Sequence, residues 1–279
     1  MKTLMIHTGG IGDLILTCPA VERLSRHGPV TLAGHPDRLQ LAVTGGIATK
    51  AISLDSIRFD SLFSTPHAIL ADAVVSCNRI IIWMNDDNQH IASTLKTITN
   101  ADIQLFPGLP PENWTRHASE YYLECLGLTQ SSPFQLAINP SVTRHDIIIH
   151  PGSGSPYKNW PIENFITLAE RLQDKGHSVI WSVGPAEQER LNHDPPGPTL
   201  QCDSLTDLAA HVAAAKLYIG NDSGISHLAA AVGTPTVAFF GPTDPAIWAP
   251  RGKCVIVLRT DPPWPTANDA LNACNEFLT

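Results

Sequence analysis

Short apolar runs alternate along this chain with longer stretches that have helical spacing. The runs at 2–8, 146–150 and 216–220 each contain consecutive apolar residues at their centre, which is typical of strands buried on both faces of a sheet. Residues 13–28 instead place apolar side chains three or four positions apart, as an amphipathic helix does. The alternation predicts an α/β fold in which parallel sheets are covered by helices on both sides.

A polar stretch at 129–144 interrupts the alternation and contains two prolines. It predicts a linker between two Rossmann-like domains, 1–135 and 136–279. Residues 36–78 show no clear period. Pro19 is expected to bend the helix at 13–28 or confine it to its first turn. The remaining expected elements are strands at 29–34, 79–83, 177–184 and 234–241, and helices at 90–98, 114–128, 160–176, 204–215 and 225–233.

Composition narrows the class of protein. The 279 residues are 43% hydrophobic, which is enough for two domains of ordinary size, and no apolar run is long enough to span a membrane. The N-terminus reaches glycine too early for a signal peptide. The six cysteines are scattered without a CxxC pair, which favours reduced thiols in the cytoplasm and argues against a structural zinc. A net charge of −8 argues against a nucleic-acid-binding surface. An anionic ligand would have to be held by a local group of donors or cations, because the overall field is negative.

The first strand ends in a glycine-rich turn, HTGGIGD, at residues 7–13. Gly9, Gly10 and Gly12 do not match the dinucleotide fingerprint, because Ile15 stands where that motif has its third glycine. The glycines indicate either a tight strand-to-helix turn or a place where a substrate approaches the backbone. Asp13 is correspondingly either an N-terminal helix cap or a base facing a cleft.

The strand at 146–150 leads into a loop of small residues, HPGSGSPYKNWP. Ser153, Gly154 and Ser155 offer amides and hydroxyls, and Lys158 precedes the next helix, so the loop predicts an oxyanion cradle. It is not a Walker P-loop. The alternative interpretation is that Lys158 is an ordinary solvated loop lysine.

The strand at 216–220 is followed by Asp222, Ser223 and Gly224, which begin a helix that includes His227. The exposed amides of a helix N-terminus attract phosphate. A capped helix with a hydrogen-bonded histidine is the alternative.

A fourth strand end carries the sequence SVGPAEQE at 182–189. Glu187 or Glu189 is a candidate to accept hydrogen bonds from a ribose diol. Equally, acidic residues are common in the first turn of a helix.

Taken together and in order, four segments resemble glycosyltransferase family 9, the ADP-heptose:lipopolysaccharide heptosyltransferases. They read GGIGDLILTCPAVERL, HPGSGSPYKNWPIENFITLAERL, VGPAEQE and YIGNDSGISHLAAAVGTPTVAFFGPTDPAIWAP. The resemblance is strongest over 9–24 and 146–251 and is weak over 36–130.

The resemblance implies a GT-B fold, with two Rossmann-like domains across a cleft, and an inverting heptose transfer from ADP-heptose. The acceptor would be a glycan or glycolipid hydroxyl in lipopolysaccharide core synthesis, with no obligatory metal or other cofactor. It implies that Asp13 and Lys158 are catalytic and that Gly9, Gly10 and Gly12 face the acceptor. The implied donor-binding residues are Ser153, Gly154, Glu187, Asp222, Ser223, Gly224 and His227.

The resemblance further implies a cytoplasmic enzyme without a transmembrane segment or nucleic-acid partner, with transient contact with the inner membrane surface. The tail, 264–279, is a candidate to return to the first domain. His7-Thr8 stands where many family members have arginine. Two alternatives stay open: another GT-B nucleotide-sugar enzyme, such as a UDP-sugar transferase or epimerase, and a non-catalytic nucleotide-sugar-binding protein. An NAD-dependent oxidoreductase is disfavoured by the mismatched glycines.

Overall fold

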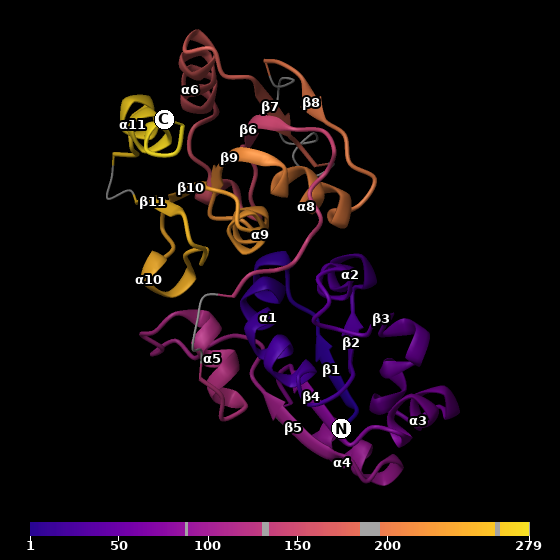
Figure 1. The fold of residues 1–279 in the computed structure, drawn as a ribbon. Coiled ribbons are helices and arrows are strands. Elements are labelled where there is room, and N and C mark those ends of the chain that lie inside the picture. Colours follow the sequence, from indigo (N-terminus) through magenta and orange to yellow (C-terminus); the bar gives the residue numbers. More distant parts are fainter. Residues whose placement is uncertain (87–88, 130–133, 185–195, 260–262, 279) are drawn as a thin grey trace. The chain divides into compact units, whose positions relative to one another are not determined.

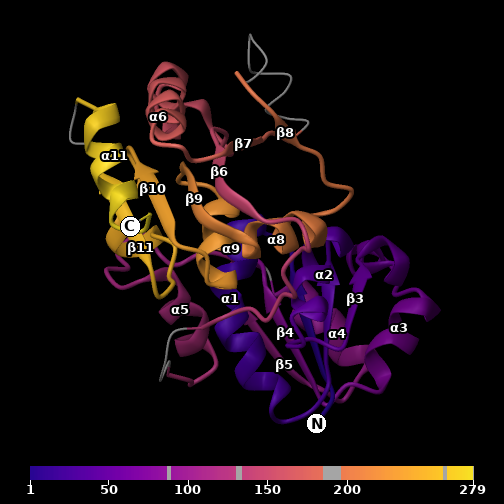
Figure 2. The ribbon, with the colours of Figure 1, turned by 45° about the horizontal axis from the view of Figure 1, so that its top comes forward.

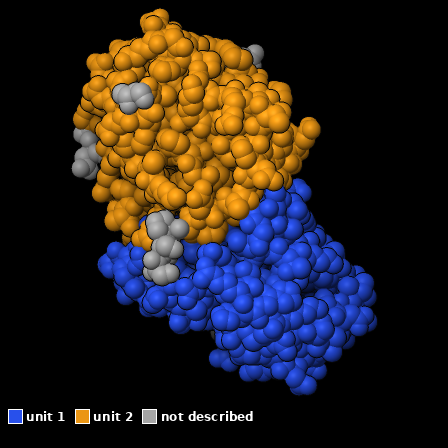
Figure 3. All heavy atoms as spheres, viewed as in Figure 1, with its two compact units in different colours: residues 1–131 blue, residues 132–279 orange. Residues whose placement is uncertain are grey.

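The computed structural model describes residues 1–86, 89–129, 134–184, 196–259 and 263–278. The chain forms two compact units, 1–131 and 132–279, coloured blue and orange in Figure 3. The sequence predicts this division a few residues later, between 135 and 136. None of the helices described is long and apolar enough to cross a membrane.

Unit 1 is built on a five-stranded parallel sheet in the order β3-β2-β1-β4-β5. Helices α1, α2 and α5 cover one face, and α3 and α4 cover the other (Figures 1 and 2). The strands are β1 (Thr3–His7), β2 (Val30–Gly34), β3 (Lys50–Ser53), β4 (Arg79–Trp83) and β5 (Asp102–Phe106), and the helices are α1 (Ile11–Ser25), α2 (Pro36–Thr44), α3 (Ala68–Val75), α4 (His90–Ile98) and α5 (Ala118–Cys125).

The central strand β1 shows why the strands of this sheet can be predicted from the sequence. All five of its residues are buried, because helices cover both faces. Leu4 and Ile6 belong to one core, with Leu70 of α3 and Leu95 of α4, while Met5 lies between them in the sequence and is also buried. An uninterrupted apolar run is the result.

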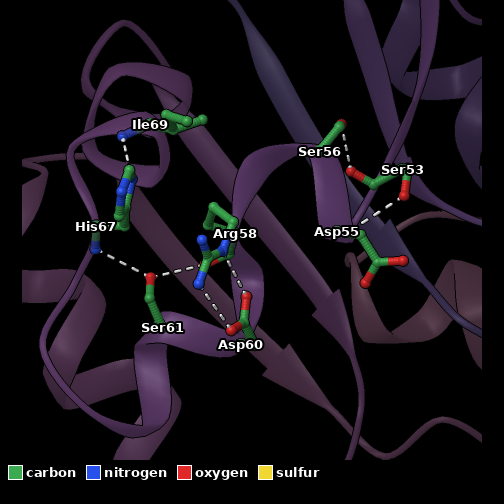
Figure 4. Close-up of polar contacts among 8 residues, drawn as sticks. All are labelled: Ser53, Asp55, Ser56, Arg58, Asp60, Ser61, His67 and Ile69. Atoms are coloured by element: carbon green, nitrogen blue, oxygen red, sulfur yellow. Dashed lines mark hydrogen bonds and ion pairs between the residues drawn. The ribbon is translucent and has the colours of Figure 1, made fainter.

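The segment that shows no clear period, 36–78, contains α2, β3 and α3 and two short 3-10 helices, η1 (Asp55–Ile57) and η2 (Phe59–Phe63). Figure 4 shows that local polar contacts organise the turn after β3. Arg58 adopts a left-handed conformation (φ 55°) and pairs with Asp60, and the Ser61 hydroxyl accepts a hydrogen bond from the backbone of His67 at 3.0 Å. Such polar contacts do not require apolar residues at regular spacing. The sequence of this turn therefore shows no periodic hydrophobic pattern.

Unit 2 has a six-stranded parallel sheet in the order β11-β10-β9-β6-β7-β8. Numbered within the unit, this is the Rossmann order 3-2-1-4-5-6. Helices α6 and α11 pack on one face, and α8 and α9 lie on the other (Figures 1 and 2). The elements are β6 (His145–His150), η3 (Pro156–Lys158), α6 (Ile162–Asp174), β7 (Val179–Ser182), β8 (Thr199–Leu200), α8 (Leu205–Ala213), β9 (Ala215–Asn221), α9 (Gly224–Val232), β10 (Thr236–Phe240), α10 (Pro245–Trp248), β11 (Val255–Arg259) and α11 (Ala267–Asn275).

Two local expectations differ from the structure. Pro19 does not confine α1 to one turn, because the helix continues to Ser25 with its apolar face buried, and this packing outweighs the lost hydrogen bond. Helix α5 is shorter than the predicted 114–128, because the His117 side chain accepts a hydrogen bond from Ser119 N–H and caps the helix there.

The tail was a candidate to return to the first domain, but its helix α11 packs within unit 2. Thr266 and Asp269 form a capping box at its start. Ala270 and Cys274 are then buried in the same core as Phe165 of α6. This helix therefore completes the cover of the unit 2 sheet.

Candidate functional site

Each sheet has one point where neighbouring strands lead to opposite faces. In unit 2 this switch point lies between β6 and β9, and in unit 1 between β1 and β4. Ligands of open α/β sheets bind beyond the carboxyl ends of the strands at this point. The segments that follow β6, β9 and β1 hold the motifs that the sequence singles out.

In unit 2 the loop after β6 is fastened to the end of β9 by Asn221. This side chain is fully buried. Its Oδ1 accepts a hydrogen bond from Trp160 N–H at 2.8 Å, and its Nδ2 donates to the Pro151 carbonyl at 2.7 Å. Both ends of the loop are therefore tied to one amide. The Trp160 ring stacks on Phe239 of β10, with centroids 4.0 Å apart, which anchors the loop to the core.

This fastening brings Lys158 and Asp222 together. Lys158 Nζ donates to Asp222 Oδ2 at 2.8 Å. The Asp222 side chain is only 7% exposed, whereas Lys158 is 35% exposed. A buried carboxylate needs a paired charge, so the solvated-lysine interpretation is wrong. The pair places an ammonium group at the switch point with its outer side open to solvent.

The helix that follows, α9, begins at Gly224 directly beside this pair. The Ser223 hydroxyl is the N-terminal cap and accepts a hydrogen bond from Ser226 N–H at 3.3 Å. His227 lies in the first turn and is buried. The capped-helix interpretation is therefore confirmed, and the phosphate site at this helix N-terminus stays a prediction.

The predicted cradle at 153–155 is partly used by the protein itself. The Ser153 hydroxyl lies 2.6 Å from Asn159 Oδ1, and it accepts a hydrogen bond from Ser155 N–H at 3.2 Å. The Ser155 amide is therefore engaged within the loop. Gly154 is exposed, and a side chain added there would meet nothing within 4 Å. His150 is buried, with its Nδ1 2.8 Å from the Ser182 carbonyl, and joins β6 to β7.

In unit 1, Asp13 occupies the third position of α1. Its Oδ2 accepts a hydrogen bond from Gly10 N–H at 2.8 Å, so the helix-cap interpretation is confirmed. Among the described residues, Oδ1 has no hydrogen-bond partner. Gly9 lies directly against this side chain, and a Cβ there would stand 2.7 Å from Asp13 Cβ. Glycine is thus required at position 9 to make room for the carboxylate. Gly12 lies within the first turn of α1.

Three further residues lie in the surroundings of Asp13: His7, Arg38 and Tyr122. Burial lowers the pKa of His7 to about 4; the charge of Arg38 adds to this effect and that of Asp13 opposes it. His7 is therefore neutral at pH 7. Arg38 of α2 donates to the Gly9 carbonyl at 3.0 Å and holds the turn in place. On the same face of the sheet, burial chiefly raises the pKa of Tyr122 in α5, and the Asp13 charge adds to that.

Sequence reasoning missed Asn221, Asn159 and Arg38. Their role is to bind backbone segments distant in sequence, and no local spacing signals it. The candidate ribose contacts, Glu187 and Glu189, lie outside the described residues.

Comparison with known proteins points to one family. The family model described as glycosyltransferase family 9 (heptosyltransferase) matches residues 83–271. A curated relative, lipopolysaccharide heptosyltransferase 1 of Pseudomonas aeruginosa, is 29% identical over 169 residues, which cover 55% of this chain and 48% of the relative. This chain spans roughly a third to a half of the curated relatives it matches.

Solved structures extend the likeness to the whole chain. The ADP-heptose lipopolysaccharide heptosyltransferase II of E. coli has a TM-score of 0.78 at 20% identity, covering 100% of this chain and 98% of that one. E. coli heptosyltransferase WaaC, solved with ADP, has a TM-score of 0.75 at 20% identity, covering 99% of both chains. The predicted fold class, two parallel-sheet α/β domains of GT-B type, is confirmed.

Replacing Asn221 with alanine should destabilise unit 2. The change leaves Trp160 N–H and the Pro151 carbonyl without their buried partner, at a cost of about 2–4 kcal/mol in the free energy of unfolding. Urea-induced unfolding measures this cost. Asn268→Ala, which removes an exposed asparagine that accepts a hydrogen bond from Arg171, is the matched control and should cost well under 1 kcal/mol. Equal effects would show that Asn221 does not fasten the loop.

The low pKa of His7 should appear as a pH dependence of stability. Between about pH 6.5 and pH 4 the unfolded chain binds a proton at this position and the folded chain does not. The free energy of unfolding therefore falls as the pH falls through this window, by up to roughly 3 kcal/mol. In His7→Gln this part of the pH dependence should be missing. Parallel stability curves for the two proteins would mean that His7 titrates normally in the folded state.

Proposed function

The chain belongs to glycosyltransferase family 9, and we propose that it transfers a heptose from ADP-heptose, with inversion, to a hydroxyl group of a lipopolysaccharide-core glycan. The names of its curated relatives support the sugar and the acceptor. Neighbouring structures solved with ADP and with ADP-2-deoxy-2-fluoro heptose support the donor. On the same premise the enzyme works in the cytoplasm and meets the inner membrane surface only while a lipid-linked acceptor is bound.

The observation that chiefly supports this proposal is the Lys158–Asp222 pair beside the N-terminus of α9. Cleavage of the donor leaves a diphosphate whose negative charge grows in the transition state. Lys158 offers its ammonium group, and the first amides of α9 offer unpaired N–H donors. Asp222 keeps that ammonium in place before the donor arrives. In the proposal this charge comes from the protein's own groups, and no resident cofactor is invoked.

In the donor site, Ser223, Gly224 and His227 surround the pyrophosphate, and Ser153 and Gly154 line the loop that faces it. The structure makes the Ser153 hydroxyl a support for this loop through Asn159. Glu187 is the proposed ribose contact.

Asp13 is proposed as the general base. Its Oδ2 is held by Gly10 N–H, which leaves Oδ1 to take the proton of the acceptor hydroxyl. The acceptor oxygen then bonds to the anomeric carbon as the bond from that carbon to the phosphate oxygen breaks, and ADP leaves. Gly9, Gly10 and Gly12 form the turn that presents this carboxylate to the acceptor.

A panel of nucleotides tests the donor half. ADP should raise the melting temperature more than UDP or GDP at equal concentration, and at a hundredfold excess over its dissociation constant it adds about 2.7 kcal/mol. Equal shifts for the three nucleotides would instead favour a different GT-B activity, such as a UDP-sugar enzyme.

Lys158→Met should weaken ADP binding by about 10- to 100-fold, since a charge-assisted hydrogen bond is worth roughly 1.5–3 kcal/mol. Calorimetric titration measures the affinity, and the melting temperature separates this loss from the cost of leaving Asp222 unpaired. Lys253→Met removes an exposed lysine and should bind ADP normally. ADP affinity within about twofold of wild type would remove Lys158 from the donor site.

Asp13→Asn separates catalysis from capping. The side-chain oxygen of asparagine can still accept the hydrogen bond from Gly10 N–H, so stability and ADP affinity should change little. Transfer should fall by about 10²–10⁴, the usual contribution of a general base. Asp37→Asn, in the exposed first turn of α2, is the control and should transfer normally. A stable Asp13→Asn enzyme with near-normal transfer would leave Asp13 as a helix cap only.

A further inference from the structure

A second group of chemically distinctive side chains lies in unit 2. Cys202, Asp207 and His211 each direct one potential ligand atom to a common point, and these atoms all lie within 4.8 Å of one another. Asp207 and His211 are one turn apart on the same face of α8, with His211 Nε2 3.8 Å from Asp207 Oδ1. Cys202 comes from the segment between β8 and α8. All three are partly buried.

We propose that this cluster, Cys202–Asp207–His211, binds a zinc ion. Thiolate, carboxylate and imidazole are the three side-chain ligands that zinc takes, at distances of about 2.0–2.3 Å. Ligand atoms around a tetrahedral zinc therefore lie roughly 3.3–3.8 Å from one another. The distance of 3.8 Å between His211 Nε2 and Asp207 Oδ1 already fits this spacing, and the Cys202 sulfur lies within 4.8 Å of both atoms. Hard cations such as Mg²⁺ and Ca²⁺ prefer all-oxygen sites, so the sulfur and nitrogen ligands favour zinc.

The surroundings of His211 support a ligand role. Its other ring nitrogen, Nδ1, lies 2.9 Å from Nε2 of His145. A metal-binding histidine commonly donates its second N–H to a neighbouring acceptor, which fixes the tautomer and the ring orientation. If His145 accepts this hydrogen bond, the lone pair of His211 Nε2 is directed toward Asp207 and Cys202. His145 is thus a positioning residue for the cluster.

The cluster is distinct from the donor site. His145 is the first residue of β6 and His150 the last, and the Lys158 loop follows His150. The zinc would join the segment before α8 to α8, and through His145 to the central strand β6. Three side chains leave the fourth position of a tetrahedral zinc to water, and the expected role of the ion is to hold these segments together. The absence of a CxxC pair argued against a zinc site in the sequence. This cluster contains a single cysteine, so a search for cysteine pairs does not detect it.

The test uses the full chain without a histidine tag, stripped with a chelator and titrated with zinc against a chromophoric competitor. Wild type should bind one zinc ion per chain, and Cys202→Ser and His211→Gln should each lose it. Cys254→Ser, at an exposed cysteine, and His177→Gln should retain it. His145→Ala should keep the stoichiometry and weaken zinc affinity by about 10- to 100-fold. No tight site in wild type, or equal binding in all variants, would overturn the proposal.

A measurement on wild type alone keeps the test independent of variant folding. Zinc should slow alkylation of Cys202 at least tenfold, as read from peptide masses, and leave alkylation of exposed Cys254 unchanged. Cobalt in place of zinc should show a thiolate-to-metal charge-transfer band. Alkylation of Cys202 at the same rate with and without zinc would contradict coordination by its thiolate.

Discussion

One buried amide determines the geometry of the proposed donor site. Asn221 sits fully buried at the end of β9 and bonds to both Pro151 and Trp160, so the loop after β6 cannot move independently of the strand beside it. Lys158 lies on that loop, and Asp222 is the residue after Asn221. The 2.8 Å ion pair between them is a consequence of this fastening. A mobile loop would have to order the lysine anew for each donor molecule, at a cost in conformational entropy.

In the proposed mechanism the two units divide the chemistry between them. Unit 2 would supply positive charge to the leaving diphosphate, through Lys158 and the N-terminus of α9. Unit 1 supplies a carboxylate, Asp13, on a turn that Arg38 holds. The same side chain caps α1 through one oxygen and leaves the other without a partner among the described residues. Structural and proposed catalytic roles therefore coexist in one residue, and Gly9 is glycine because that residue needs the space.

Much of the fold was predictable, because parallel strands that are buried on both faces have consecutive apolar residues, as in β1 and β6. The turn after β3 was not, since Arg58, Ser61 and His67 organise it by local hydrogen bonds without a hydrophobic period. Lys158 and Asp222 were each singled out, but their pairing across 64 positions depends on strand order, which local patterns do not encode. Asn221 went unnoticed, because nothing in the sequence distinguishes a buried amide from an exposed one.

The central claim is that the carboxyl edge of the unit 2 sheet holds the nucleotide diphosphate. Amide chemical shifts of the full chain during titration with ADP test it most directly. The account predicts that the amides of 153–159 and 222–227 shift first and furthest, while those around Cys202, Asp207 and His211 stay in place. Saturable ADP binding that leaves the amides of 222–227 unmoved would contradict it.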